Sequence, residues 1–557
     1  MVLNRLPIFL ILALAFTLRV LGVNFGLPDL YHADEPIVVN HALAFGSGDF
    51  NPHFFKIPPL VSYLLFPIYG LFFLLGKTAG LFGSVKDFEL LFYTNPTVFY
   101  LLARLIFGVL LGTLSVYIFY RFLLKTDSLE RALVGAFLLS VCLLHVRQSH
   151  YVYADIPLVL VMILAYFPLM KTARAEARFK DHLAMGFYIG LAAAVKYNGG
   201  VLVIPYFFAL GWPFKKKIFY GCFLTLGVSF ITFALLNPYA FLDFKFFVQE
   251  IYNESEAHRG GVPGFYHATY SLANAMGWPL FLVSLFGLGK ALFNKDKARQ
   301  TFAFFAISYY VVLCRWGQPY PRYVLPLLPV LFLFASDVLV NFFGATIGKK
   351  RLGIFLVTVI LALPTFLHAV LFDRVMLAPD NRTLAKAWIE ENVVTGSKIA
   401  LEQDFYMPRL RFSPTQLEEK KFKLGAESFH AQAKMRKLDF LQADARKRPS
   451  YELYELSHDV RVKEDFVLTP PKLSYDLESL RAAGIEYVIV VRLWEIDLHQ
   501  GFYDALQQKA ELVAEFNPYR GAKRLWPYTH PLTGGPFLFR DLWERERNGQ
   551  PLKIYKI

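Results

Sequence analysis

Acidic residues stand at two places where charge is costly in an otherwise apolar chain. Asp34 and Glu35 lie side by side in YHADEP (residues 31–36), and Asp155 lies in YADIP (residues 153–157). A carboxylate can take a proton from a hydroxyl group, so each is a candidate general base. Because adjacent carboxylates repel, we expect the pKa of one member of the Asp34–Glu35 pair to be raised. The alternatives are solvated loop carboxylates for the pair and a helix cap for Asp155.

Basic residues occur near the same ends of the apolar runs as these acids. The segment RWGQPYPRY (residues 315–323) places two arginines among aromatic residues. Gathered Arg and Lys side chains suit a negatively charged ligand such as a lipid phosphate. Snorkelling to the membrane interface is the alternative role for most of them, although it explains the two arginines of residues 315–323 less well. The candidate cations are Lys56, Arg147, Lys196, Arg259, Arg315 and Arg322.

Metal and nucleotide motifs are missing from the sequence. The histidines are scattered without HExxH or paired spacing, and neither a P-loop nor GxGxxG occurs. No cofactor is certain from this pattern. A divalent metal is left open, with Asp155 and His258 as candidate ligands. The three cysteines form no disulfide framework or CxxC pattern.

The composition indicates a polytopic membrane protein. Of the 557 residues, 55% are hydrophobic and only 18% are charged, against about 25% charged residues in ordinary soluble domains. A soluble protein would struggle to bury so much apolar surface. The net charge of +14 comes mainly from the apolar part of the chain. The positive-inside rule explains it there, so nucleic-acid binding is not expected.

The number of membrane spans depends on one apolar run, residues 58–76. With this run at the surface, the loops on one side carry 18 Lys and Arg and the loops on the other side carry nine. This bias favours an interfacial or re-entrant helix at 58–76 and a cytoplasmic amino terminus. The eleven predicted spans, each of about 20 residues or fewer, are 6–28, 98–120, 132–146, 155–170, 183–195, 201–212, 218–238, 270–289, 301–314, 323–344 and 352–372.

The long apolar runs end near residue 372 and divide the chain into two predicted domains. Residues 1–372 form the transmembrane domain, and its first extracytoplasmic loop, 29–97, carries interfacial helices. In residues 373–557, AKAWIEENVV (residues 385–394) predicts a helix, and SKIALEQ (397–403) and IEYVIVVRL (485–493) predict strands. This mixture is typical of one α/β or α+β domain. An odd number of spans places this C-terminal domain outside. The turn KYNGG (residues 196–200) is predicted to join two short helices at an outward tip.

Several of these features together resemble a known family. After the acidic pair come KIPPL (residues 56–60), Asp155, the KY pair at 196–197 and RYVLPLLP at 322–329. Their order and shared outward placement resemble the GT-C glycosyltransferases. The similar branch is glycosyltransferase family 39, with the protein O-mannosyltransferases and the lipid A aminoarabinose transferase. The resemblance covers residues 1 to about 372 and implies a polytopic α-helical GT-C fold with a C-terminal extracytoplasmic domain.

The resemblance also implies roles for particular residues. Members of this family take a sugar from a polyprenyl-phosphate donor and transfer it with inversion on the extracytoplasmic face. By resemblance, Asp34 matches the catalytic base, Glu35 its partner and Asp155 a second acid. Candidate contacts of the donor phosphate are Lys56, Lys196, Arg322 and Tyr323 by resemblance, and Arg259 from its HRGG turn.

The implied protein is a hexosyl- or pentosyltransferase of a plasma membrane. Its partners would be the lipid-linked donor, the bilayer and an acceptor hydroxyl on a lipid, glycan or protein. The segment DNRTLAKAWIEEN (residues 380–392) resembles the tail of bacterial and archaeal members, so a prokaryotic source is expected. The alternatives are a secondary transporter and a membrane protein that binds lipid-linked sugar without catalysis. Transporters often show inverted repeats and midplane charges, whereas here the acids stand at span ends.

Overall fold

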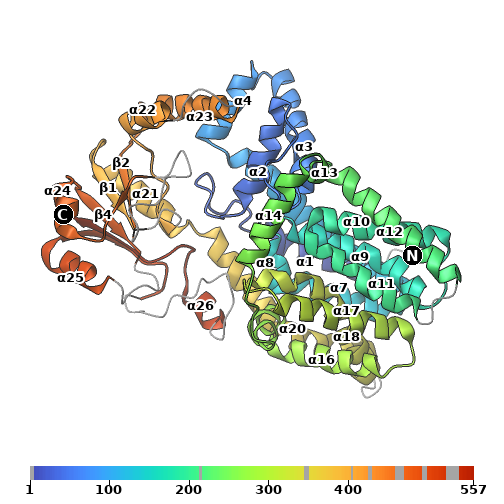
Figure 1. Cartoon of the computed structure of the whole chain (residues 1–557). Coiled ribbons are helices and arrows are strands. Elements are labelled where there is room, and N and C mark those ends of the chain that lie inside the picture. Colours follow the sequence, from blue (N-terminus) through green and yellow to red (C-terminus); the bar gives the residue numbers. More distant parts are fainter. Residues whose placement is uncertain are drawn as a thin grey trace.

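The computed structural model consists of a helical bundle and a smaller domain built on a β-sheet (Figure 1). It describes residues 6–211, 216–343, 350–402, 406–423, 429–457, 470–491, 499–521 and 538–557. The expected polytopic helical fold with a C-terminal α/β domain is confirmed. The main helices of the bundle are α1 (Leu6–Val20), α3 (Leu60–Thr78), α5 (Thr97–Ala103), η2 (Arg104–Leu110), α6 (Leu111–Thr126), α7 (Leu129–Val141), α8 (Leu143–Gln148), α9 (Asp155–Ala173), α10 (Phe179–Val195), η3 (Tyr197–Leu202), α11 (Val203–Leu210), α12 (Lys216–Leu236), α14 (Phe244–Ala257), η4 (His267–Leu272), α15 (Ala273–Met276), α16 (Trp278–Leu292), α17 (Lys297–Cys314), η5 (Pro321–Leu327), α18 (Leu328–Val338), η6 (Leu339–Phe343) and α20 (Lys350–Leu377).

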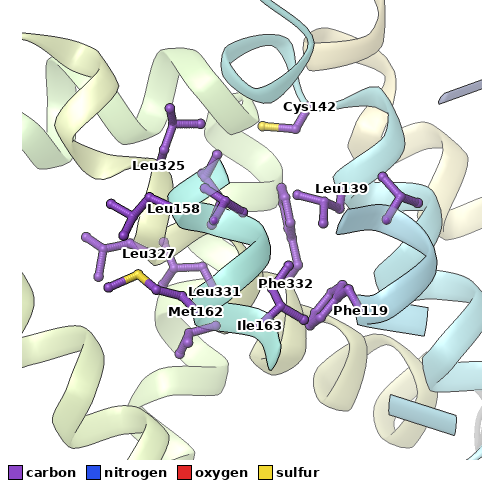
Figure 2. Close-up of a cluster of buried hydrophobic side chains, with 14 of the residues drawn as sticks. Phe119, Leu139, Cys142, Leu158, Met162, Ile163, Leu325, Leu327, Leu331 and Phe332 are labelled. Carbon is purple, nitrogen blue, oxygen red and sulfur yellow. The ribbon is translucent and has the colours of Figure 1, made fainter. Parts of the chain in front are cut away.

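Two helical segments form the centre of the bundle. In α9 and in the segment Pro321–Asn341, 83% and 94% of the most apolar stretch is buried, against 11% in Phe219–Leu236 at the periphery. Figure 2 shows the contact between these segments, where Leu158 and Met162 of α9 lie near Leu327 and Leu331. Close packing on all sides fixes both segments firmly, and so fixes any residue in their first turns.

Each of the eleven predicted spans overlaps one or more helices, although in the first span, 6–28, the helix already ends at Val20. Within the described residues, however, only six helices are long and apolar enough to cross a membrane, or seven if one bent pair counts as a span. That pair, His267–Met276 and Trp278–Leu292, covers the predicted span 270–289 and is bent by 114° at Gly277. Gly277 has a φ of +79°, a left-handed conformation that ends one helix, and Pro279 starts the next.

Helix α3 covers the run that decides the topology. Leu60–Thr78 is one of the six helices long and apolar enough to span. Its length therefore permits a span, and its interfacial position stays a prediction based on loop charge. The outer loop predicted at 29–97 also contains α2 (Glu35–Ala44) and α4 (Val85–Thr94).

The C-terminal domain is a six-stranded sheet flanked by helices. The strand order is β3-β2-β1-β4-β6-β5. The first four strands are parallel to one another, and β6 pairs antiparallel with both of its neighbours, β4 and β5. The helix predicted from AKAWIEENVV and the strands predicted from SKIALEQ and IEYVIVVRL are present as α21, β1 and β4. The elements are α21 (Asn381–Asn392), β1 (Lys398–Leu401), α22 (Pro414–Lys423), α23 (Phe429–Ala445), β2 (Glu452–Leu456), β3 (Lys472–Leu473), α24 (Leu477–Ala482), β4 (Tyr487–Val490), α25 (Gln500–Lys509), β5 (Glu511–Phe516), α26 (Leu538–Glu544) and β6 (Leu552–Lys556).

This domain is attached to the bundle at three places. Helix α20 runs past residue 372 without a break and ends in the domain, where Arg374 donates to the Leu542 carbonyl at 2.6 Å. Helix α23 lies against α4, with the rings of Tyr93 and Phe440 stacked at 5.8 Å. The third contact joins Lys386 of α21 to Asp29 at 2.5 Å, five residues before Asp34.

Candidate active site

Asp34 is the residue just before α2, and its carboxylate forms an ion pair with Arg322. The two residues are 288 positions apart in the chain and meet because Arg322 stands in the first turn of the buried segment that begins at Pro321. The Asp34 side chain is 24% exposed and that of Arg322 is 18% exposed. A small acceptor group can therefore reach a carboxylate that is already held in place.

Glu35 has a different environment from its neighbour. Its two oxygens accept from Arg104 Nε and Nη2 at 2.8 and 2.7 Å, and one also accepts from the Val152 N–H at 3.0 Å. Both side chains are buried. Arg104 also donates to the carbonyls of Val23 and Phe25. This bidentate pair ties the end of the first helix, η2 and the loop before α9 to the start of α2.

The pKa values of the two acids correct one expectation. Burial is the largest single influence on Asp34 and raises its pKa. The charge and hydrogen bond of Arg322, together with the nearby His32 and Lys196, outweigh burial, and the net pKa lies below its usual value. Burial is likewise the largest influence on Glu35 and raises its pKa. Arg104, together with His32 and the Val152 N–H, outweighs burial, and the net pKa is again lowered. The expectation that one member of the pair has a raised pKa is wrong, because each carboxylate faces its own guanidinium group.

A second ion pair lies beside the first. Asp155 is the first residue of α9, and it accepts from Lys196 Nζ at 2.6 Å. Lys196 precedes η3, in the predicted turn between α10 and α11. Burial lowers the pKa of Lys196, while Asp155 acts in the opposite direction. The close carboxylate offsets much of the cost of placing an ammonium group here.

Tyrosine rings separate the two pairs. Arg322 lies 5.0 Å from the ring centre of Tyr153 and 6.0 Å from that of Tyr323, and Lys196 lies 5.6 and 5.0 Å from the same rings. Tyr320 is a third ring, 4.9 Å from Arg322. Aromatic faces stabilise cations without neutralising them. Within the described residues, the buried Nε of Arg322 has no hydrogen-bond partner, so the guanidinium retains a donor.

The remaining predicted phosphate contacts lie farther out. Lys56 is exposed, and its segment is attached to the Lys196 turn because Tyr197 donates to the Phe55 carbonyl at 2.9 Å. Arg259 is 78% exposed and pairs with Glu256 on its own helix end. Thus the structure brings Asp34, Asp155, Lys196, Arg322 and Tyr323 together, but places Lys56 and Arg259 outside the buried cluster.

The candidate metal ligands do not form a metal site in the described residues. No group of three or more His, Cys, Asp or Glu is placed there to hold an ion. Asp155 is paired with Lys196, and His258 Nε2 lies 3.1 Å from the Tyr323 hydroxyl. His258 therefore belongs to the rim of the tyrosine cluster.

Sequence reasoning missed Arg104 and Tyr153. Arg104 is a charged residue inside the apolar run 98–120, which is a signal for a functional or paired group. Tyr153 stands two residues before Asp155, but nothing in the sequence indicates that Lys196 and Arg322 both face its ring.

One protein-family model matches the chain. It is described as dolichyl-phosphate-mannose-protein mannosyltransferase and matches residues 89–239. This stretch includes Arg104, Asp155 and Lys196 and lacks Asp34 and Arg322. No curated protein sequence matches the chain significantly.

Two solved structures show a distant likeness to the chain. ArnT from Cupriavidus metallidurans in the apo state is 15% identical, with 91% of this chain and 95% of that chain covered and a TM-score of 0.49. The Archaeoglobus fulgidus oligosaccharyltransferase in the apo form is 11% identical, with 88% and 70% covered and a TM-score of 0.47. The family model over residues 89–239 confirms the resemblance to the GT-C glycosyltransferases that the motifs indicated.

Proposed function

We propose that this protein is a membrane glycosyltransferase that moves a sugar from a polyprenyl-phosphate donor to an acceptor hydroxyl. The observation that carries the proposal is the pair of carboxylate–cation contacts, Asp34–Arg322 and Asp155–Lys196, which meet across tyrosine rings at the ends of buried helices. This arrangement places a base and two cations within one site, as transfer from a phosphate leaving group requires.

The proposed reaction is a single displacement. The acceptor oxygen attacks the anomeric carbon while the bond from that carbon to the phosphate oxygen breaks, and the electron pair leaves on the phosphate. Asp34 takes the proton of the hydroxyl group. Arg322 and Lys196 stabilise the charge that develops on the departing phosphate. Glu35 holds α2 in place through Arg104 and takes no part in proton transfer, because both of its oxygens are already bound.

Arg322 has two proposed partners in this reaction. Without the donor it pairs with Asp34 and keeps that carboxylate a weak base. A phosphate group competes for the same guanidinium, which offers five N–H donors in a fork. As the phosphate takes a share of Arg322, the pKa of Asp34 rises toward its usual value and the carboxylate becomes a better base. Donor binding would thus prepare the base.

The sugar is a hexose or pentose, the acceptor is a lipid, glycan or protein hydroxyl, and the site faces the extracytoplasmic side of a prokaryotic plasma membrane. These parts of the proposal rest on the family resemblance and on loop charge. A phosphatase fusion after residue 377 should be active outside the cell; activity only in the cytoplasm would contradict this orientation.

The test of the function is an assay of the purified chain in liposomes with a polyprenyl-phosphate sugar labelled in the sugar. The proposal predicts cleavage of the sugar–phosphate bond and transfer of the label. Arg322→Ala should lower both donor affinity and turnover, since a charge-assisted contact contributes about 1.5–3 kcal/mol. Movement of intact donor across the bilayer without bond cleavage would indicate a transporter instead.

A further inference from the structure

A cavity lies between three helices of the bundle, away from the candidate active site. It has a volume of about 520 Å³ and is lined mainly by apolar side chains of α1, α7 and α20, including Leu10, Leu14, Leu133, Phe137 and Ile354. Ligand pockets typically have volumes of about 300–1,000 Å³. We call this cavity the α1–α7–α20 groove.

The groove opens at the end of the bundle opposite to the sheet domain. Its lining includes Arg351, near the start of α20, whereas Arg374 of the same helix contacts the C-terminal domain. At a rise of 1.5 Å per residue, these two arginines stand about 35 Å apart. This distance exceeds the roughly 30 Å hydrocarbon thickness of a bilayer. The groove is therefore open to the membrane leaflet opposite to the one near Asp34 and Arg322. A donor whose phosphate is bound at Arg322 cannot also place that phosphate in the groove.

The mouth of the groove carries positive charge. Arg351 is 81% exposed and pairs with Glu130 at 3.3 Å. An exposed ion pair of this kind contributes little to stability, so Arg351 can readily leave Glu130 for another anionic partner. In the sequence, Lys349 and Lys350 directly precede Arg351, and Arg5 directly precedes α1, so the chain next to the starts of these two helices is rich in basic residues.

We infer that the α1–α7–α20 groove binds an anionic phospholipid of the surrounding bilayer. The acyl chain lies against the apolar side chains, and the phosphate lies at Arg351. At this depth the medium around the helices is lipid hydrocarbon, so an acyl chain is what can fill the apolar part of the groove. The basic mouth selects for negative charge, and basic pockets between membrane helices on the cytoplasmic side are suited to anionic head groups. The predicted cytoplasmic side of the protein is this same end.

Native mass spectrometry of the full-length protein with phosphatidylglycerol and phosphatidylcholine of identical acyl chains tests the inference. We expect wild-type protein to retain phosphatidylglycerol about fivefold more strongly, and Arg351→Ala to abolish most of that preference. Leu133→Trp, which fills the groove, should lower retention of both lipids. The matched controls are Arg121→Ala, an exposed arginine of α6, and Phe223→Trp, an exposed aromatic residue of α12.

Equal retention of the two lipids by wild-type protein would overturn the inference, as would a loss of preference in Arg121→Ala as large as in Arg351→Ala. Displacement of the bound lipid by polyprenyl phosphate would also overturn it. Because Arg351 is exposed, its variant should fold even if Leu133→Trp does not. The readout is lipid retention, so the result does not depend on glycosyl transfer.

Discussion

At the scale of single residues, the two neighbouring acids Asp34 and Glu35 have separate tasks because they have separate arginine partners. Asp34 remains partly exposed beside Arg322, and Glu35 is buried against Arg104. Sequence alone predicted that these acids matter and that cations lie on the same face. It could not predict the pairing, since Arg104 and Arg322 reach their partners only through folding of distant segments.

Glu35→Gln should lower stability strongly. The change removes one charge of a buried bidentate pair and leaves Arg104 charged in a buried site, which typically costs about 3–5 kcal/mol. The measurement is the melting temperature of the purified variant. Glu89→Gln is the matched control, because its pair with Arg436 is partly exposed to solvent and should contribute at most about 1 kcal/mol to stability. Equal, small shifts in both variants would contradict the role given to Glu35.

The pH dependence of stability should reflect the titration of the same two carboxylates. The pKa values of Asp34 and Glu35 are below their usual values in the folded protein. Their contribution to the free energy of unfolding is therefore complete above the pKa values of the unfolded chain, about 4. It is lost as the pH falls through the lower pKa values of the folded protein. Melting temperatures should decline below about pH 4. The double variant Asp34→Asn/Glu35→Gln should show a flatter decline, and an identical pH profile would argue against these pairs.

At the scale of elements, the site depends on where helices begin and break. Asp155 begins α9, Arg322 lies in the first turn of η5, and Lys196 stands at the break between α10 and η3. The hairpin at Lys196 was predicted because basic segments flank both ends of its apolar run. The break at Gly277 was not predicted, because the apolar run itself continues through it and only the backbone conformation ends the helix.

Gly199→Ala should disturb the Lys196 turn. A Cβ at Gly199 would lie 2.4 Å from the Ala192 backbone, so η3 would have to move away from α10 and carry Lys196 with it. We expect a loss of about 1–3 kcal/mol in stability and weaker donor binding. The control is Gly200→Ala, where the nearest atom lies at 3.9 Å. Thermal melting and donor titration measure the two effects. Equal behaviour of the two variants would contradict the view that the close approach at Gly199 holds the Lys196 turn in place.

At the scale of the whole molecule, the C-terminal domain is attached close to the proposed base. Lys386 of α21 pairs with Asp29, and Arg382 lies 3.7 Å from the ring centre of Tyr31, three residues before Asp34. The sequence predicted a separate folded domain here, and its helix and strands are present in the structure. Its contact with the loop of Asp34 could not be predicted, because that contact depends on how two independently patterned parts of the chain pack.

Lys386→Met should therefore reduce turnover severalfold while donor affinity stays near wild type, since the phosphate contacts lie in the bundle. The charge-swapped double variant Asp29→Lys/Lys386→Asp should recover much of the activity by restoring the pair. Lys398→Met is the control, because its pair with Glu452 lies within the domain at 4.0 Å. An equal loss of activity in Lys398→Met, or no recovery in the charge-swapped variant, would show that the Lys386–Asp29 pair does not support turnover.

The most direct test of the account is the effect of Asp34→Asn on turnover and on donor affinity, measured separately. The amide keeps the size of the side chain but cannot take the acceptor proton, so turnover should fall by about 100- to 10,000-fold. Donor affinity should be retained or increased, because Arg322 no longer shares its charge with a carboxylate. Asp87→Asn, in the same outer loop, should behave like wild type. Near wild-type turnover in Asp34→Asn would contradict the assignment of the base, and a parallel loss of donor binding would contradict the division of labour between Asp34 and Arg322.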